Sequence, residues 1–339
     1  DHLGINRDNL VTITFLLLYS FASCLIYKIA SLFFEGYTPL LSGIIWATYP
    51  FNLWLTKQPN SEIPFFVFFF WSIYMLIIGI RSNSTKFIIG ASILISLAML
   101  VRAAAILVPF IFVISYMTYY IFKRNEKNGW NFKNIFKKSF IMIALPIIIT
   151  APWEALVYKE TGKLLPLTST GADLIRITNL NILKPRPDGA LIVSDELKHY
   201  LASTLSFEER CSIISDYCDA NRPIIISKKS IYISAELYWI KFKRAFHGID
   251  TKRFEDEVTL VQCLYFIPIL FGLVLTIRKK DIVLLNIIIA SLSLYFISIS
   301  MIGLPLLRYM LPAFGLYAMY AASSTNWLLE KILKRQKGN

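Results

Sequence analysis

Val283–Ile302 reads VLLNIIIASLSLYFISISMI and contains no charged residue. A run of about 20 apolar residues is what an α-helix needs to cross the hydrocarbon core of a bilayer. Buried strands of soluble proteins are shorter, commonly about 4–8 residues, and are bounded by turns. Leu10–Ala30 is a second run with almost no interruption. These stretches predict membrane-spanning helices and argue against a soluble α/β core.

Hydrophobic residues make up 56% of the 339 in the chain, and similar runs recur along it. The sequence therefore predicts an all-α fold, a polytopic membrane helical bundle of about nine spans with a mostly helical extracytoplasmic insert. The expected spans lie near residues 10–30, 37–56, 63–80, 86–101, 103–122, 139–154, 258–277, 282–302 and 305–328.

The basic residues of the short connections predict the orientation, because Lys and Arg accumulate on the cytoplasmic side. One set of connections carries sixteen basic residues, and the opposite set carries only four. We expect a multi-pass protein of a bacterial inner membrane, since abundant Ile, Lys and Asn fit an AT-rich genome, with residues 155–257 in the periplasm and the C terminus in the cytoplasm. The basic set comprises residues 28–36, 81–86, 123–138, 278–281 and the tail from 330.

This orientation accounts for nearly all of the net charge of +13. A basic tail such as Lys331–Lys337 is an orientation signal and a contact for lipid headgroups. Basic residues interleaved with aromatic residues in a folded domain, as a nucleic-acid site needs, are not evident. We therefore predict the lipid bilayer as a partner and exclude nucleic acid.

The predicted spans and their orientation divide the chain into three domains. These are residues 1–154, the first part of the bundle with six spans; 155–257, the extracytoplasmic helical domain; and 258–339, the last three spans and the basic tail. Within the insert, Ser206–Glu209 has the spacing of a capping box, and Ser194-Asp195 resembles an earlier helix start. The segment from Ile224 to Phe246 reads as an amphipathic helix on the membrane surface or on the bundle.

Three charged residues stand at the ends of apolar runs, and the threading places all three at the outer face: Glu62, Arg102 and Arg308. Charges at membrane depth are costly and usually face a cavity, a partner or a substrate. Both arginines oppose the orientation rule, and Arg308 also opposes the dipole of the helix that it begins. The alternative without a ligand is that these long side chains extend to the membrane interface, where their charged ends reach water.

The guanidinium group of arginine is planar, stays charged at physiological pH and can bind two phosphate oxygens at once. We therefore predict Arg102 and Arg308 as ligands of a lipid phosphate. Glu62 follows Ser61 at a helix start, where an acid complements the helix dipole. It can equally orient an acceptor or a sugar hydroxyl. Lys57, Tyr309 and Arg176 are further candidates for the cavity lining.

Four segments occur in an order that resembles a known group. Together they are similar to the protein mannosyltransferase-like branch of the C-type glycosyltransferases, which includes dolichyl-phosphate-mannose protein mannosyltransferases and lipid A aminoarabinose transferases. The segments are Gln58–Phe66, Leu97–Arg102, Ala151–Glu154 with the following Gly162–Asn179, and Arg308–Pro312.

The resemblance implies a transferase that moves a sugar from a polyprenyl-phosphate donor to a lipid, glycan or protein acceptor on the outer side, by inversion. It implies that Arg102 and Arg308 hold the donor phosphate and that Glu62 lines the same cavity. The family's catalytic Asp belongs to a first outer loop, which corresponds to sequence upstream of Asp1. We therefore expect upstream sequence and leave the catalytic residue unassigned.

Two other classes stay open. An O-antigen ligase or polymerase has many spans, a large outer loop and a polyprenyl-linked donor, but transfers whole glycans. A transporter or flippase for a lipid-linked substrate predicts internal symmetry and interrupted helices near the midplane, and no convincing repeat is evident. His2, His199 and His247 lack the spacing of metal ligands, so no cofactor is assigned, and a divalent metal stays open.

Overall fold

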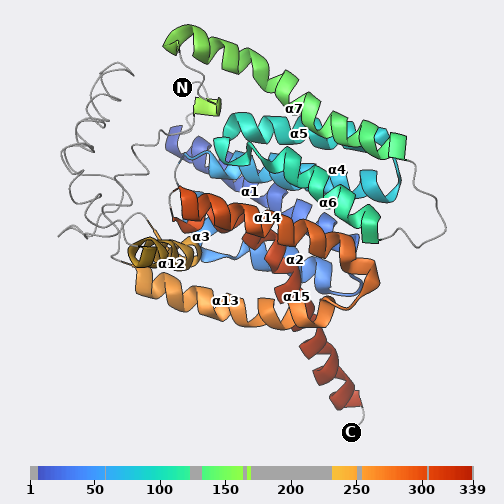
Figure 1. The fold of residues 1–339 in the computed structure, drawn as a ribbon. Helices are drawn as coiled ribbons and strands as arrows, with labels where there is room; N and C mark the ends of the chain where they lie inside the picture. Colours follow the sequence, from blue (N-terminus) through green and yellow to red (C-terminus); the bar gives the residue numbers. More distant parts are fainter. Residues whose placement is uncertain are drawn as a thin grey trace. The chain divides into compact units, whose positions relative to one another are not determined.

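The computed structural model describes residues 7–57, 59–122, 132–162, 166–168, 231–249, 254–303 and 305–337. Every regular element in these ranges is a helix (Figure 1). The α-helices are α1 (Arg7–Ser31), α2 (Thr38–Ala47), α3 (Pro50–Leu55), α4 (Glu62–Arg81), α5 (Thr85–Val101), α6 (Val108–Phe122), α7 (Phe132–Thr161), α12 (Ile231–His247), α13 (Glu255–Thr276), α14 (Val283–Ile302) and α15 (Leu307–Lys337), with short 3-10 helices η1 (Ala103–Ala105), η2 (Pro166–Thr168) and η3 (Lys280–Ile282).

The all-α prediction is confirmed over the described residues. Six helical segments are long and apolar enough to cross a membrane, and α2 and α5 are shorter apolar helices. The predicted number of nine spans is not confirmed. The six are Asn9–Ser31, Glu62–Arg81, Ala103–Phe122, Lys133–Thr161, Glu255–Thr276 and Lys280–Ile302.

The predicted span at 37–56 is not one continuous helix. It breaks between α2 and α3, where Tyr49 has an extended backbone with φ −65° and ψ 117° and Pro50 begins α3. Proline has no N–H for the helical ladder, and its ring disfavours the helical conformation in the residue before it. Pro50 is therefore the physical reason for the break.

The helices divide into two compact units. The first comprises Asp1–Leu156, Leu264–Leu294 and Pro312–Asn339, and the second comprises Val157–Cys263 and Tyr295–Leu311. In the first unit, α4 packs against α1 and α5, and α1 packs against α2.

Aromatic side chains fill the core of the first unit. Phe65, Phe66, Phe69 and Phe70 of α4 are all almost completely buried. The Trp46 ring meets the edges of the Phe66 and Phe70 rings, with ring centroids 5.5 and 5.6 Å apart. Such edge-to-face pairs stabilise beyond the area they bury. They fix α2 against α4, just before the α2–α3 break.

Predicted cytoplasmic connections gather at one end of the first unit. The Arg81 guanidinium, at the end of α4, donates to the carbonyl oxygens of Leu32 after α1 and Asp281 in η3. Lys138 of α7 donates through Nζ to the Asn83 carbonyl at 2.8 Å, in the turn between α4 and α5. This grouping agrees with the expectation that these connections share one side. Which side faces the cytoplasm stays a prediction.

A cavity of about 750 Å³ lies at the same end of the first unit. Three carboxylates contribute to its wall: Glu35 after α1, Asp281 in η3 and Glu330 in α15. Glu330 Oε1 accepts a hydrogen bond from Asn326 Nδ2 at 2.9 Å. Because Arg81 ends α4 here, this cavity lies about 30 Å along the helix from Glu62 at its start.

In the second unit, the end of α12 contacts the start of α15. The Gly248 carbonyl accepts a hydrogen bond from the Leu307 N–H at 2.8 Å, at the start of α15. A Cβ at Gly248 would lie 2.6 Å from the carbonyl oxygens of Arg244 and Pro305. Only glycine fits this close approach, which fixes where α15 begins.

Candidate functional site

Glu62 is placed by the start of α4. Asn60 Oδ1 accepts the Ile63 N–H at 3.1 Å, and Asn60 Nδ2 donates to the Leu55 carbonyl at 2.5 Å. Asn60 thus satisfies one of the open donors at the helix start and ties α4 to α3. Ser61 makes no side-chain cap. Glu62 is 6% exposed in the first turn.

Arg102 is placed by the end of α5. Its backbone is extended, with φ −145° and ψ 122°, between α5 and η1. Its N–H donates to the Ala98 carbonyl at 2.9 Å, and its carbonyl accepts the Ala105 N–H at 3.1 Å. The backbone at Arg102 is thus a short break in the helix, after which the chain continues into η1 and α6. Because α4 and α5 are antiparallel neighbours, this break lies beside the start of α4.

The two side chains form a salt bridge, with 2.6 Å between Arg102 Nη1 and Glu62 Oε1. The Arg102 and Glu62 side chains are only 12% and 8% exposed. Removing one partner of a buried ion pair leaves an uncompensated charge, which is strongly destabilising. The pair therefore fixes the Arg102 guanidinium where the end of α5 lies beside the start of α4. This pairing is a feature that the sequence did not predict.

Arg308 lies in the first turn of α15, in the second unit. The N–H of the preceding residue, Leu307, donates a hydrogen bond to the Gly248 carbonyl. The Tyr309 N–H donates to the Leu306 carbonyl at 3.0 Å. The Arg308 guanidinium lies 5.7 Å from the centre of the Tyr309 ring. A cation and an aromatic face attract each other at this distance. The backbone of this turn is therefore held at a defined place on α12.

The predicted site residues fall into three groups. Glu62 and Arg102 meet in the first unit, where Lys57 is exposed in the turn after α3. Arg308 and Tyr309 are neighbours in the second unit. Arg176 lies outside the described residues, as do Ser194-Asp195 and the Ser206–Glu209 capping box. The expectation that all of the charges share one cavity stays a prediction.

Lys241 of α12 lies in the segment that the sequence predicts as an amphipathic helix, yet it is only 1% exposed. Its Nζ donates to the Ile302 carbonyl at 3.2 Å, at the end of α14. A cation next to a helix C-terminus is favourable. Burial nevertheless lowers the pKa of Lys241 to about 8, because desolvation disfavours the charged form.

This shift predicts a pH dependence of stability. In the unfolded chain a lysine keeps a pKa near 10.4, so between about pH 8 and pH 10 the unfolded state binds more protons than the folded state. Stability therefore rises with pH across this window, by about 3 kcal/mol at most, and is flat below it. Unfolding temperatures measured in detergent from pH 7 to pH 10 check this.

Lys241→Met removes the titrating group and should remove this rise. Lys243→Met changes an exposed lysine of the same helix and serves as the control. Equal pH slopes in Lys241→Met and the unaltered protein would contradict the assignment.

Metal chemistry receives no assignment from the described residues. Within them, no group of three or more His, Cys, Asp and Glu side chains is close enough to hold a metal ion. A divalent metal requirement stays a prediction.

Residues 3–153 match the model of a family described as dolichyl-phosphate-mannose-protein mannosyltransferase. The match includes Glu62 and Arg102 but ends before Arg308, and it covers less than half of the chain. It confirms the resemblance drawn from the sequence motifs. The match suggests glycosyltransferase activity and, with the apolar helices, an integral multi-pass membrane protein. No curated protein and no solved structure matches the chain.

Proposed function

We propose that this chain serves a membrane glycosyltransferase that moves a sugar from a polyprenyl-phosphate donor to a lipid, glycan or protein acceptor on the outer face. The observation that carries the proposal is the buried Glu62–Arg102 pair, within the segment that matches the mannosyltransferase family. The pair lies at the opposite end of α4 from Arg81 and its basic connections. This end of α4 is the predicted outer face. A guanidinium held in place there suits the binding of an anionic donor.

Arg102 and Arg308 bind the donor phosphate in this proposal. When the bond between the sugar and the phosphate oxygen breaks, negative charge develops on the departing phosphate. Positive groups that are already in place stabilise this charge without reorganising during the reaction. The salt bridge to Glu62 and the Gly248–Leu307 hydrogen bond support such rigid placement of Arg102 and of the α15 turn that carries Arg308.

Glu62 acts first as a positioning residue, because its carboxylate holds the Arg102 guanidinium. The same carboxylate is the candidate contact for an acceptor or a sugar hydroxyl. The displacement is a single inverting step, in which an acidic residue takes the proton of the acceptor hydroxyl. The residue that takes this proton is left unassigned.

The proposal is tested with the complete protein in proteoliposomes that contain a radiolabelled polyprenyl-phosphate hexose in the outer leaflet, with a mixture of envelope lipids, glycans and proteins supplied as acceptors. We expect the label to leave the lipid donor and polyprenyl phosphate to accumulate. Movement of intact donor between leaflets would favour the transporter and contradict the proposal. Transfer from polyprenyl-linked oligosaccharides, with the single-sugar donor untouched, would favour the ligase.

A further inference from the structure

Over residues 238–247, the part of α12 whose side chains are described, the burial pattern is inverted relative to an amphipathic helix in water. Lys241 and Arg244 are 1% and 5% exposed, and they point into the second unit. Tyr238 and Trp239 are 47% and 59% exposed. A surface helix in water turns its apolar stripe inward and its charges outward. The outward face of α12 is therefore matched to something less polar than water.

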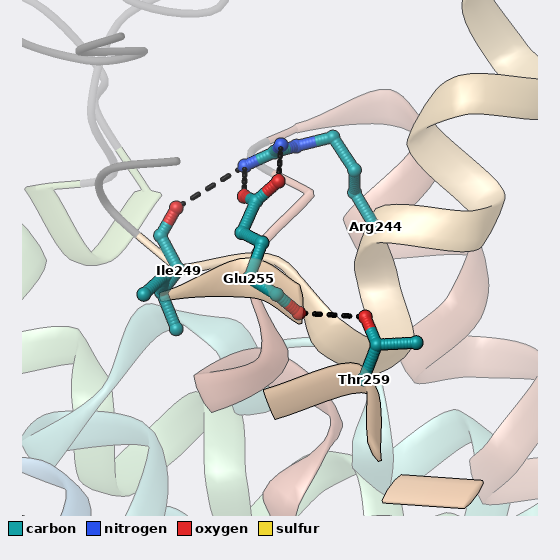
Figure 2. A network of polar contacts seen from close by, with 4 residues as sticks. All are labelled: Arg244, Ile249, Glu255 and Thr259. Carbon is teal, nitrogen blue, oxygen red and sulfur yellow. Dashed lines mark hydrogen bonds and ion pairs between the residues drawn. The ribbon is translucent and has the colours of Figure 1, made fainter. Parts of the chain in front are cut away.

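The buried cations of α12 contact the ends of two candidate membrane spans. Lys241 Nζ donates to the carbonyl of Ile302, the last residue of the span Lys280–Ile302. Figure 2 shows Arg244 facing Glu255, the first residue of the span Glu255–Thr276, with 2.6 Å between Arg244 Nη1 and Glu255 Oε2. These contacts place α12 at the level where two spans reach the edge of the bilayer.

Further contacts between the end of α12 and the start of α13 strengthen this placement. Arg244 uses both terminal nitrogens on the Glu255 carboxylate, and Nη2 also donates to the Ile249 carbonyl at 3.1 Å (Figure 2). Thr259 Oγ1 donates to the Glu255 carbonyl at 2.6 Å. A two-pronged arginine–carboxylate pair fixes direction as well as distance. The end of α12 is therefore fixed to the start of a membrane span.

The outward face has the chemistry of a membrane interface. The Trp239 and Phe242 rings stack with their centres 5.8 Å apart, and Phe246 meets Phe242 edge-on at 5.4 Å. Lys243 Nζ lies 5.7 Å from the centre of the Trp239 ring. Trp and Tyr concentrate at headgroup depth, and lysines there extend their amines toward water and phosphate. Phe254, just before α13, is a further exposed aromatic residue.

We propose that α12 is an interfacial helix that binds phospholipid, with Tyr238, Trp239 and Lys243 turned into the headgroup region of the outer leaflet. The partner is the lipid surface itself. The choice rests on the two span ends that α12 contacts and on the aromatic and basic groups of its exposed face.

One consequence deepens the proposed function and rests on it. Gly248, directly after α12, accepts the N–H of Leu307, so the neighbouring Arg308 lies level with the end of an interfacial helix. Lipid phosphates lie at that depth. The donor phosphate can therefore reach Arg308 sideways from the leaflet, with its polyprenyl chain still in the hydrocarbon core.

The test measures which quencher reaches position 239 in lipid nanodiscs. The full chain receives Trp239→Cys after its four cysteines are replaced by serine, and the new thiol carries a bimane fluorophore. Leu264→Cys on the exposed side of α13 and Arg335→Cys in the exposed tail are the lipid and water controls. For position 239 we expect quenching by headgroup nitroxide lipids about threefold above that by aqueous iodide. The Arg335 label should show the reverse order, and the Leu264 label should respond most to nitroxides on the acyl chains.

Quenching at position 239 that matches the Arg335 control would place α12 in water and overturn the proposal. Protection from every quencher would mean that protein covers this face, which overturns it as well. If the labelled chain does not fold, Trp fluorescence is measured instead with the same nitroxide lipids. The difference in quenching between the unaltered protein and Trp239→Phe then reports the surroundings of Trp239. Neither measurement needs turnover, so failure of the proposed transferase activity leaves the result readable.

Discussion

Replacing Arg308 by alanine in the complete protein should lower the consumption of polyprenyl-phosphate sugar by about 10²–10³-fold. The loss follows from removing a positive group from the place where charge develops on the departing phosphate. The truncated side chain is half-buried in the first turn of α15. The hydrogen bond between Leu307 and Gly248 joins backbone atoms and does not need the guanidinium. Membrane insertion and unfolding temperature should therefore change little.

Two variants sharpen this prediction. Arg308→Lys keeps the charge and loses the planar fork, so activity should lie between that of the unaltered protein and that of Arg308→Ala. Arg278→Ala removes an exposed arginine after α13 and should leave turnover unchanged. Unchanged turnover in Arg308→Ala would refute the assigned role, whatever its effect on stability.

Replacing Glu62 by alanine should destabilise the protein by about 3–5 kcal/mol, because the buried Arg102 guanidinium loses the Glu62 carboxylate with which it pairs. The Arg102 side chain is only 12% exposed, so water replaces the carboxylate poorly. The measurement is the unfolding temperature in detergent. Glu35→Ala, which removes an exposed carboxylate from the first unit, is the matched control and should shift this temperature little.

The double variant Glu62→Leu/Arg102→Met separates stability from activity. Replacing both members of a buried ion pair by apolar residues of similar volume is often neutral or stabilising. We expect this variant to unfold near the temperature of the unaltered protein and to consume little donor, since it lacks the Arg102 guanidinium. A normal unfolding temperature in Glu62→Ala, or full activity in the double variant, would contradict the account of this pair.

Helices α1 and α14 follow from the length of their apolar runs alone. The run 10–30 lies within α1, and the run 282–302 begins one residue before α14 and ends with it. The break at Pro50 had a signal in the sequence, because proline cannot continue the hydrogen-bond ladder. An apolar window does not register it, since Pro50 is one residue in a run that stays apolar on both sides.

The candidate site was predictable as residues and not as contacts. Glu62 and Arg102 stand out because charges are rare beside apolar runs, but their salt bridge joins positions 40 residues apart. It needs the packing of α4 on α5, which no local pattern specifies. The helix start shows the same limit: Ser61 follows the usual preference, yet Asn60 makes the cap because its longer side chain also reaches the Leu55 carbonyl.

The amphipathic helix shows where periodicity misleads. The sequence predicted an amphipathic helix between 224 and 246, and the charged side chains of such a helix usually form the face turned to water. Lys241 and Arg244 are buried instead, because the end of α14 and the Glu255 carboxylate offer oxygen partners inside the unit. Periodicity shows that two faces differ. It does not show which face meets protein when the other can meet lipid.

The most direct test of the central claim is equilibrium binding of polyprenyl phosphate to the complete protein in nanodiscs, with uncharged polyprenol as the comparison ligand. If Arg102 and Arg308 both hold the phosphate, Arg308→Ala and the double variant Glu62→Leu/Arg102→Met, which leaves no carboxylate buried without its arginine, should each weaken binding of polyprenyl phosphate about tenfold or more, since hydrogen bonds to charged groups contribute about 1.5–3 kcal/mol. Binding of polyprenol should not change. Equal affinity for polyprenyl phosphate in the unaltered protein and in both variants would contradict the claim.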